Sequence, residues 1–395
     1  LHRQCAPASA QYLMTDAPGQ SALTLPRFTL PMKPAEFLRD YWQKKPLFMP
    51  GAASGLDEPD ADTLAGLALE DNVEARIIRG SAGGSWELKQ GPFEETVFAE
   101  LGERDWTLLV QSVDHYLTDV SLLLDSFAFL PNWRLEDIMM SYAAKGGSVG
   151  PHYDRYDVFL IQAAGSRRWQ IGDTCDDKTP KLPHPDLKLL ADMPVREAFA
   201  ANPGDVLYLP PGVAHHGVAE DSDCITWSVG FRAPDYQMLM AEIAGECLAD
   251  ADSELFTDPD RPVTGDPSVL ADADRQQLIR GALDLLNPAA IERAVYRWLS
   301  TPRLDGLEFA VDDAHIRHRD PSIALVRHGS VRLILQGNIA WLNGEPYSLT
   351  EQQRPLVQLL ARQRCYTRDA LDAVMQPAGS ELLHDWIEQG FFAPL

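Results

Sequence analysis

The order of apolar and polar residues divides the chain into stretches of different character. Residues 34–42 place apolar side chains at Phe37, Leu38 and Tyr41, a spacing that predicts a short amphipathic helix. Between about 134 and 232, short β-branched, aromatic and apolar runs are separated by glycine and proline, which predicts an antiparallel sandwich or barrel. The strand-like runs are 157–161, 168–171, 205–209 and 225–231.

From residue 236 to about 300 the pattern is helical and acidic. Residues 241–275 carry ten acidic side chains against two arginines, and three prolines interrupt them. This composition fits either a solvated connection of helices and loops or a binding segment, and the pattern does not decide between them.

The last segment mixes strands and helices in the manner of a winged helix. Strand-like runs surround a predicted hairpin turn at Asn343-Gly344, and two helical patterns follow. The first helical pattern has Thr350 as its predicted N-cap, and the second ends at Gly390. The strand-like runs are 322–326, 331–335, 339–342 and 346–349, and the helical patterns are 350–364 and 381–389.

Charge narrows the classes of partner. The 395 residues include 34 Lys and Arg against 58 Asp and Glu, which gives a formal net charge of −24. A broad nucleic-acid surface or an anionic membrane surface needs clustered cations, so the balance disfavours both and favours a cationic partner or simple solubility. Residues 301–395 hold nine Arg against twelve acidic residues, which disfavours DNA binding by the winged-helix-like segment.

The cysteines and the hydropathy pattern predict a cytoplasmic protein. Five cysteines are scattered without a C-x-x-C pair, which argues against a disulfide scaffold or a cysteine-rich zinc site. The sequence has no run of roughly 18 apolar residues that would span a bilayer. Residues 1–20 lack the layout of a signal peptide, and we expect them to lie outside the folded part.

Three His-x-Asp triplets are candidates for metal binding: His152/Asp154, His184/Asp186 and His318/Asp320. Ten histidines and the frequency of Asp predict about one such triplet by chance, so the context must separate them. The third spells the kinase His-Arg-Asp, but the Asn and the glycine-rich loop of kinases are missing. The second lies among prolines and charged residues and is expected to be an exposed loop.

The triplet at His152 has a different setting. It follows a glycine-rich turn and leads into a strand-like run, where residues i and i+2 point to the same face. Sixty-one residues after Asp154, a turn, a strand and a second turn lead to His215. Two imidazoles and one carboxylate can occupy one face of a metal and leave three positions open, as in ferrous oxygenases. A His–Asp pair that only stabilises a barrel is the structural alternative.

Two neighbouring features compete with this interpretation. His216, directly after His215, is a rival ligand, and the spacing of the residues does not choose between the two. The sequence Gly146-Gly-Ser148-Val-Gly150 matches the nucleophile elbow of hydrolases, but an elbow needs a helix directly after its serine. A strand-like run follows instead, so Ser148 is expected to be a turn residue. Phosphate-cradling and dinucleotide-binding glycine patterns do not occur.

Taken together, several motifs resemble the bacterial ribosomal oxygenases. They are Gly150-Pro-His152-x-Asp154, Asp157-Val-Phe159, Gly165-Ser-Arg167-Arg-Trp169, Pro203-Gly-Asp205, Pro210-Pro-Gly-x-x-His215 and Ser228-Val-Gly-Phe-Arg-Ala-Pro234. Members of this family are JmjC-type cupin dioxygenases that hydroxylate an arginine side chain of a large-subunit ribosomal protein. The resemblance covers nearly the whole chain.

The resemblance implies an α+β protein with three folded regions. A double-stranded β-helix (cupin/JmjC jelly roll) would form the catalytic domain over 21–235. A helical dimerisation region would occupy 236–300, and a winged-helix-like domain would occupy 301–395.

The resemblance also implies roles for single residues. His152, Asp154 and His215 would hold Fe(II), and Arg167 would bind the distal carboxylate of 2-oxoglutarate, a role that suits the guanidinium fork. Arg168 would then point to the opposite face of its strand. His216 would lie at the neighbouring surface or behind the ligands. Many relatives have, at the position of Ala143, a side chain whose hydroxyl also contacts this carboxylate. In this chain Ser141 and Tyr142 are the two alternatives for that hydroxyl, and the sequence does not choose between them.

The implied reaction hydroxylates C3 of an arginine and releases succinate and CO2. Tyr156 and Ser228 would line the substrate pocket, and the partners would be a basic ribosomal protein and a second copy of the chain. Relatives act on arginine or histidine, a choice that the sequence leaves open. Two other classes of function remain: a metal-dependent cupin enzyme that acts on a small molecule without 2-oxoglutarate, and a non-catalytic cupin sensor with a winged-helix effector.

Overall fold

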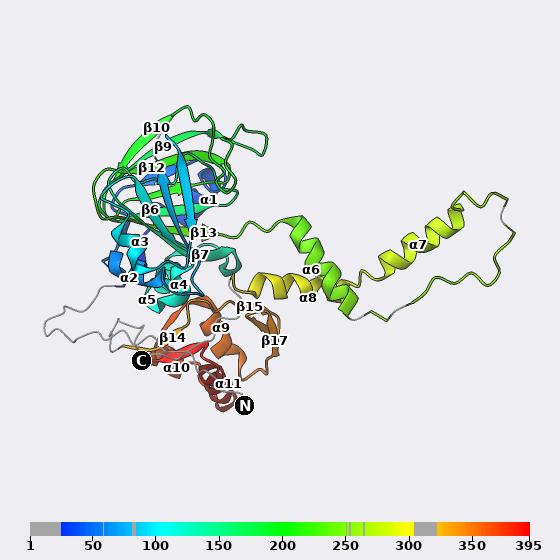
Figure 1. Ribbon diagram of the computed structural model, residues 1–395. Coiled ribbons are helices and arrows are strands. Elements are labelled where there is room, and N and C mark those ends of the chain that lie inside the picture. Colours follow the sequence, from blue (N-terminus) through cyan, green and yellow to red (C-terminus); the bar gives the residue numbers. More distant parts are fainter. Residues whose placement is uncertain are drawn as a thin grey trace, which may run out of the picture.

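The computed structural model describes residues 25–57, 59–80, 84–249, 251–252, 254–263, 265–303 and 322–395. The segment 1–20 and the triplet His318-Arg-Asp320 lie outside the described residues. The described chain forms a strand-rich domain, an arm of three helices and a smaller C-terminal domain (Figure 1).

The strand-rich domain is a double-stranded β-helix, as predicted. Its larger sheet has the order β2-β11-β8-β13-β7-β6-β4-β5 and its smaller sheet the order β10-β9-β12, and every pair is antiparallel. The larger sheet contains β2 (Leu47–Met49), β4 (Ala75–Gly80), β5 (Trp86–Gln90), β6 (Trp106–Val110), β7 (Leu135–Ala143), β8 (Val158–Ala164), β11 (Val206–Leu209) and β13 (Cys224–Phe231). The smaller sheet contains β9 (Arg167–Thr174), β10 (Glu197–Ala201) and β12 (Val213–Ala219).

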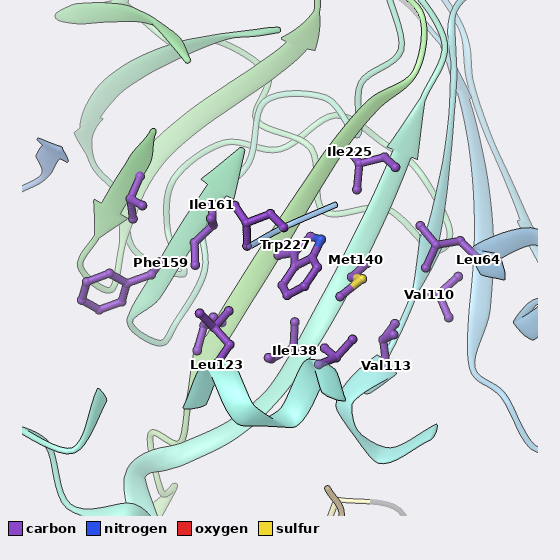
Figure 2. Packing of buried hydrophobic residues seen from close by; sticks show 14 of the residues in the cluster. Leu64, Val110, Val113, Leu123, Ile138, Met140, Phe159, Ile161, Ile225 and Trp227 are labelled. Atoms are coloured by element: carbon purple, nitrogen blue, oxygen red, sulfur yellow. The ribbon is translucent and has the colours of Figure 1, made fainter. Parts of the chain in front are cut away.

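Short helices and a two-stranded ribbon cover the back of the larger sheet, which is the face that points away from the smaller sheet. They are β1 (Arg27–Phe28), α1 (Pro34–Asp40), β3 (Ala53–Ser54), α2 (Ala61–Leu67), α3 (Glu95–Ala99), α4 (Val113–Tyr116), α5 (Thr118–Ser121) and the 3-10 helices η1 (Leu122–Phe127) and η2 (Asn132–Arg134). Alternate residues of the central strands point back into this layer and form the main core (Figure 2). Among them, Trp227, Phe159 and Ile138 are fully buried.

The front of the larger sheet faces the smaller sheet. Residues that lie directly opposite each other in an antiparallel pair share a face, so the strand register identifies the front residues. Leu160 lies opposite Ser228 and Leu207, and it packs with Trp169 and Ile171 of the smaller sheet. Further front residues are polar: Asp137, Ser141, Gln162 and Thr226. The domain therefore has an apolar back, which folds it, and a partly polar interior between its sheets.

The helical arm projects from the body (Figure 1). It comprises α6 (Tyr236–Ala249), α7 (Asp272–Asp284) and α8 (Pro288–Ser300), and an ion pair between Arg293 and Glu246 joins α8 to α6 at 2.9 Å. Helix α7 buries none of its residues in the single chain. None of the helices in the described part of the chain combines the length and the apolar character that a membrane-spanning helix needs.

The C-terminal domain has the strands and helices of a winged helix. Its sheets have the orders β18-β14-β19 and β15-β16-β17 around a separate apolar core. The predicted hairpin turn is present, since Asn343 and Gly344 both take the left-handed conformation with φ of 47° and 86°. The elements are β14 (Ile323–Arg327), β15 (Leu333–Gln336), β16 (Ile339–Leu342), β17 (Glu345–Ser348), α9 (Arg354–Arg362), β18 (Cys365–Thr367), α10 (Arg368–Asp372), α11 (Pro377–Glu388) and β19 (Phe392–Pro394).

The predicted starts of both helical patterns in this domain are wrong. Helix α11 begins at Pro377, four residues before the predicted start at 381. Helix α9 begins at Arg354 and not at Thr350, because residues 351–353 form a separate turn. The Thr350 hydroxyl accepts from the Gln353 amide at 3.3 Å, so it caps that turn and not the helix.

Candidate active site

Three side chains from two distant segments meet between the sheets. His152 and Asp154 lie in the loop between β7 and β8, whereas His215 lies in β12, yet their ligand atoms are all within 4.8 Å of one another. A short backbone bridge holds the segments together: the His152 amide donates to the His215 carbonyl at 3.0 Å, and the His215 amide donates back at 2.8 Å. The Gly212 amide donates to the Asp154 carbonyl at 2.7 Å.

Both imidazoles are fixed through Nδ1. Nδ1 of His152 lies 2.9 Å from the Gly150 carbonyl oxygen, and Nδ1 of His215 lies 3.0 Å from that of Val213. Because a carbonyl oxygen only accepts hydrogen bonds, Nδ1 carries the proton in each ring and Nε2 keeps its lone pair. Nε2 of His215 lies 3.6 Å from Oδ2 of Asp154. Two oriented nitrogens and a carboxylate oxygen are a donor set that suits a divalent transition metal with open positions.

Burial keeps His215 in the form that a metal needs. Removal from water, and next the adjacent His152, lower the pKa of His215 from 6.5 to about 4. At neutral pH the ring is therefore uncharged and binds a metal without first losing a proton.

The competing residues lie elsewhere. His215 pairs with Ile171 and His216 with the next residue, Gln170, so the two histidines point to opposite faces of β12. His216 is 8% exposed, so of its two expected settings the surface is excluded. His184 contacts the Trp86 carbonyl and does not belong to the cluster. The Ser148 hydroxyl accepts from the Gly150 amide at 3.0 Å within a turn, and no helix follows it.

Arg167 lies inside the barrel at one end of this site. Its partners in the sheet are Ala219 and Ala201, and it is 3% exposed. The Nε and Nη2 atoms of Arg167 are buried without a hydrogen-bond partner among the described residues. Arg168 is exposed and pairs with Glu220 at 2.8 Å, as strand alternation predicts. A buried guanidinium with free donors is costly alone and suits a carboxylate that arrives from outside.

Trp169 separates Arg167 from the histidines. The Arg167 guanidinium lies 5.6 Å from the ring centre of Trp169, and the His215 ring lies 6.0 Å from it. Gly217, directly opposite Trp169, leaves the room that the indole needs.

We expect a Gly217→Ala variant to be less stable by roughly 1–3 kcal/mol, because the added Cβ would lie 2.6 Å from the Trp169 ring. Chemical denaturation measures the change. Gly245→Ala in α6 is the matched control, since its Cβ would meet nothing within 4 Å and alanine favours a helix. Equal stability of the two variants would contradict the close packing at Gly217.

Strand β7, which precedes the glycine-rich turn, places one hydroxyl side chain at the Arg167 end of the interior. Ala143 and Ser141 are on the front face, and Ala143 packs with Ala219, the sheet partner of Arg167. Tyr142 points to the other face, where its hydroxyl donates to Asp223 at 2.7 Å. Of the two open substitutes for the missing hydroxyl, only Ser141 therefore faces the interior.

The opposite end carries a carboxylate. Asp137 lies on the same face of β7 as Ala143 but six residues away, which is about 20 Å along a strand. It is 3% exposed and accepts from Gln111 and Ser112, both at 2.7 Å. Ser228 lies in the neighbouring strand on the front face.

Tyr156 stands at the mouth beside Asp137, with 43% of its surface exposed. The negative charge of Asp154, with a further contribution from Asp137, raises the pKa of its hydroxyl. Gly230 lies against both side chains, since an added Cβ there would be 3.5 Å from Oδ1 of Asp137 and 4.0 Å from Cε2 of Tyr156. The interior thus offers a cation at one end, metal ligands between, and a carboxylate with an aromatic ring at the other.

Comparison with curated proteins connects this arrangement to a family. The chain is 33% identical over 367 residues to the ribosomal protein uL16 3-hydroxylase of Escherichia coli, an alignment that covers 90% of this chain and 96% of the relative. It is also 41% identical over 242 residues to a probable ribosomal oxygenase of Haemophilus influenzae, which covers 60% of this chain and 59% of that protein. The chain belongs to the ribosomal oxygenase family.

Solved structures of a ribosomal oxygenase share the whole fold. The Escherichia coli ribosomal oxygenase YcfD in complex with cobalt and 2-oxoglutarate superposes with a TM-score of 0.75 and 31% identity, covering 93% of this chain and 99% of that one. A further YcfD structure gives a TM-score of 0.79 at 30% identity and the same coverage of this chain. The predicted jelly-roll core and winged-helix-like domain are confirmed.

Family profiles match overlapping parts of the chain. The JmjC domain profile matches residues 122–239, and a ROXA-like winged-helix profile matches residues 277–393. A profile of the AraC-like ligand-binding domain also matches residues 195–301.

Two residues of this ribosomal oxygenase site escaped the sequence reasoning. Trp169 and Asp137 were given no role, although Trp169 lies inside the predicted run 168–171. The alternation Arg167, Trp169, Ile171 would have placed Trp169 on the same face as the arginine. No local pattern indicates Asp137, whose setting depends on strands more than 80 residues later.

Proposed function

We propose that this protein is an Fe(II)- and 2-oxoglutarate-dependent hydroxylase of a ribosomal protein, with an arginine of uL16 as the side chain that it oxidises. The observation that carries the proposal is the buried Arg167, whose free donors face the same interior as the cluster of His152, Asp154 and His215. The name of the Escherichia coli relative and the cobalt and 2-oxoglutarate in the YcfD structure support the same assignment.

In this proposal His152, Asp154 and His215 hold the iron. The carbonyls of Gly150 and Val213 keep both Nε2 atoms aimed at the metal position. When bound, the iron supplies the activation of dioxygen that oxidation of a C–H bond requires.

Arg167 takes the distal carboxylate of 2-oxoglutarate through two parallel N–H donors. Trp169 forms the flat wall along the cosubstrate, and the Ser141 hydroxyl is the nearest candidate on the interior face for a second contact. The apolar residues between the sheets exclude water from this end and so strengthen the ion pair.

The substrate enters at the other end. A cationic side chain finds the Asp137 carboxylate and the Tyr156 ring there, and Ser228 supplies a hydroxyl. The net charge of −24 raises the encounter rate with a basic ribosomal protein, although it fixes no specificity. We place the reaction in the cytoplasm, where a ribosomal substrate is available.

Turnover of 2-oxoglutarate to succinate tests this function. We expect purified protein with Fe(II) and O2 to form succinate slowly alone and several-fold faster with uL16. The control is uL16 in which the candidate arginine is replaced by lysine. A protein that binds iron but neither binds nor turns over 2-oxoglutarate would instead support a cupin enzyme that acts on a small molecule.

We further propose domain limits and a homodimer. The catalytic domain would span 21–235, the dimerisation region 236–300 and the winged-helix-like domain 301–395. Helix α7 supports the dimer because Leu278, Ile279 and Leu283 are 50%, 49% and 59% exposed on a helix without buried residues.

We expect the double variant Leu278→Glu/Leu283→Glu to become a monomer, because charges on both apolar positions cannot be buried in an interface. Light scattering after size exclusion measures the mass. Gln276→Glu on the same helix adds charge at an exposed polar position and should leave the dimer intact. A dimeric double variant would place the interface elsewhere.

A further inference from the structure

Three buried arginines surround one cavity between the catalytic domain and the winged-helix-like domain. Arg327, Arg332 and Arg364 are 2%, 4% and 3% exposed, although Arg is rarely buried without a partner. All three line a cavity whose other walls are Asn132, Trp133, Leu299, Val331, Leu333 and Ile334. In a chain with a net charge of −24, a buried group of cations is an unexpected feature.

The three guanidiniums are only partly satisfied. Arg327 donates to the Leu360 carbonyl at 2.9 Å, and Arg332 donates to the carbonyls of Gly329 and Glu136. The Nε atom of each of the three arginines is buried without a hydrogen-bond partner among the described residues. Buried guanidiniums are costly when their donors lack acceptors, and the cavity that the three side chains line is where a further acceptor can reach them.

Nearby carboxylates balance only part of this charge. Of the described carboxylates, Asp125 is the one within ion-pair distance of any of the three arginines, at 3.7 Å from Arg364. Asp114 is close enough to act on Arg332 and Arg364, but burial raises its pKa to about 7, so at neutral pH it is charged only part of the time. Glu136 is paired with Arg232 at 2.6 Å. The group therefore keeps an excess of positive charge.

We propose that a small inorganic anion of the halide class, chloride being the abundant one, binds between Arg327, Arg332 and Arg364. The cavity has room for about one particle of the size of a water molecule, so a monatomic anion is the largest anion that it admits and a nucleotide or an organic acid is excluded. The anion would be shared by the side chains of the C-terminal domain and by the wall from Asn132 and Trp133 of the catalytic domain. It would therefore strengthen the contact between the two domains.

Bromide replaces chloride and scatters anomalously, so diffraction from crystals of the full chain grown in bromide tests the site directly. We expect an anomalous peak between the three guanidiniums. Thermal unfolding is the second measurement, in sodium chloride and in sodium gluconate at the same ionic strength. We expect a Tm roughly 3 °C higher in chloride, with an effect that saturates as chloride is raised.

The variant Arg327→Met separates this site from general salt effects. It removes one guanidinium that has a single described side-chain hydrogen bond, and we expect the Tm difference between the two salts to fall to near zero. Arg362→Met, an exposed arginine at the end of α9, is the control that should keep the full difference. The absence of a bromide peak, together with equal salt responses of the wild type and Arg327→Met, would overturn the proposal.

Discussion

A His152→Ala variant is expected to lose more than about 100-fold in affinity for iron and all measurable hydroxylation. Replacement of residues that merely support a metal ligand costs about 10–100-fold, and loss of a ligand costs more. His152 also anchors the bridge to His215, but the alanine variant keeps the two backbone hydrogen bonds of that bridge. The fold should therefore survive, and metal analysis after dialysis together with succinate release measures the loss.

His184→Ala is the matched control for this variant. His184 also belongs to a His-x-Asp triplet, but it lies outside the cluster and contacts the Trp86 carbonyl. It should keep iron and activity. Retention of full iron affinity by His152→Ala would show that the cluster is not the metal site.

An Arg167→Ala variant is expected to weaken 2-oxoglutarate binding by on the order of 100-fold, or about 3 kcal/mol, because two charge-assisted hydrogen bonds to a buried carboxylate are lost. Iron affinity should stay unchanged, since Trp169 separates Arg167 from the histidines. The rise in Tm with added 2-oxoglutarate measures binding without turnover. The wild type should show this rise and the variant should show little of it.

Arg168→Ala is the neighbouring control. Its side chain is exposed and paired with Glu220, so its removal should change 2-oxoglutarate binding less than twofold. Equal loss of 2-oxoglutarate binding in both variants would mean that the wrong face of β9 has been assigned to the interior. Unchanged binding in both variants would mean that β9 does not hold the carboxylate of 2-oxoglutarate.

The parts of the site that the sequence predicted depend on local geometry. His152 and Asp154 are two residues apart beside a strand, and a turn–strand–turn pattern leads to His215 and His216, so short-range spacing was sufficient to propose this region as a metal site. The choice of His215 over His216 came from the family resemblance. The choice of Arg167 over Arg168 came from the family resemblance, and strand alternation added that only one of the two reaches the interior. The strand-like runs and the hairpin at Asn343-Gly344 were likewise set by period and turn chemistry.

The parts that escaped prediction depend on contacts between distant segments. Asp137 acquires its setting from β13, which follows it by more than 80 residues, and from Gln111 and Ser112. The buried group of Arg327, Arg332 and Arg364 forms only where two domains meet, and nothing in the local pattern distinguishes these arginines from surface residues. The start of α9 was misplaced because Thr350 caps a turn that precedes the helix.

Mass spectrometry of uL16 after reaction with the purified protein, Fe(II), 2-oxoglutarate and O2 tests the central claim most directly. We expect a gain of about 16 Da for the one added oxygen atom, localised to an arginine by fragmentation and absent with His152→Ala. An unchanged mass of uL16, from a protein that binds iron and 2-oxoglutarate, would contradict the assignment of this substrate.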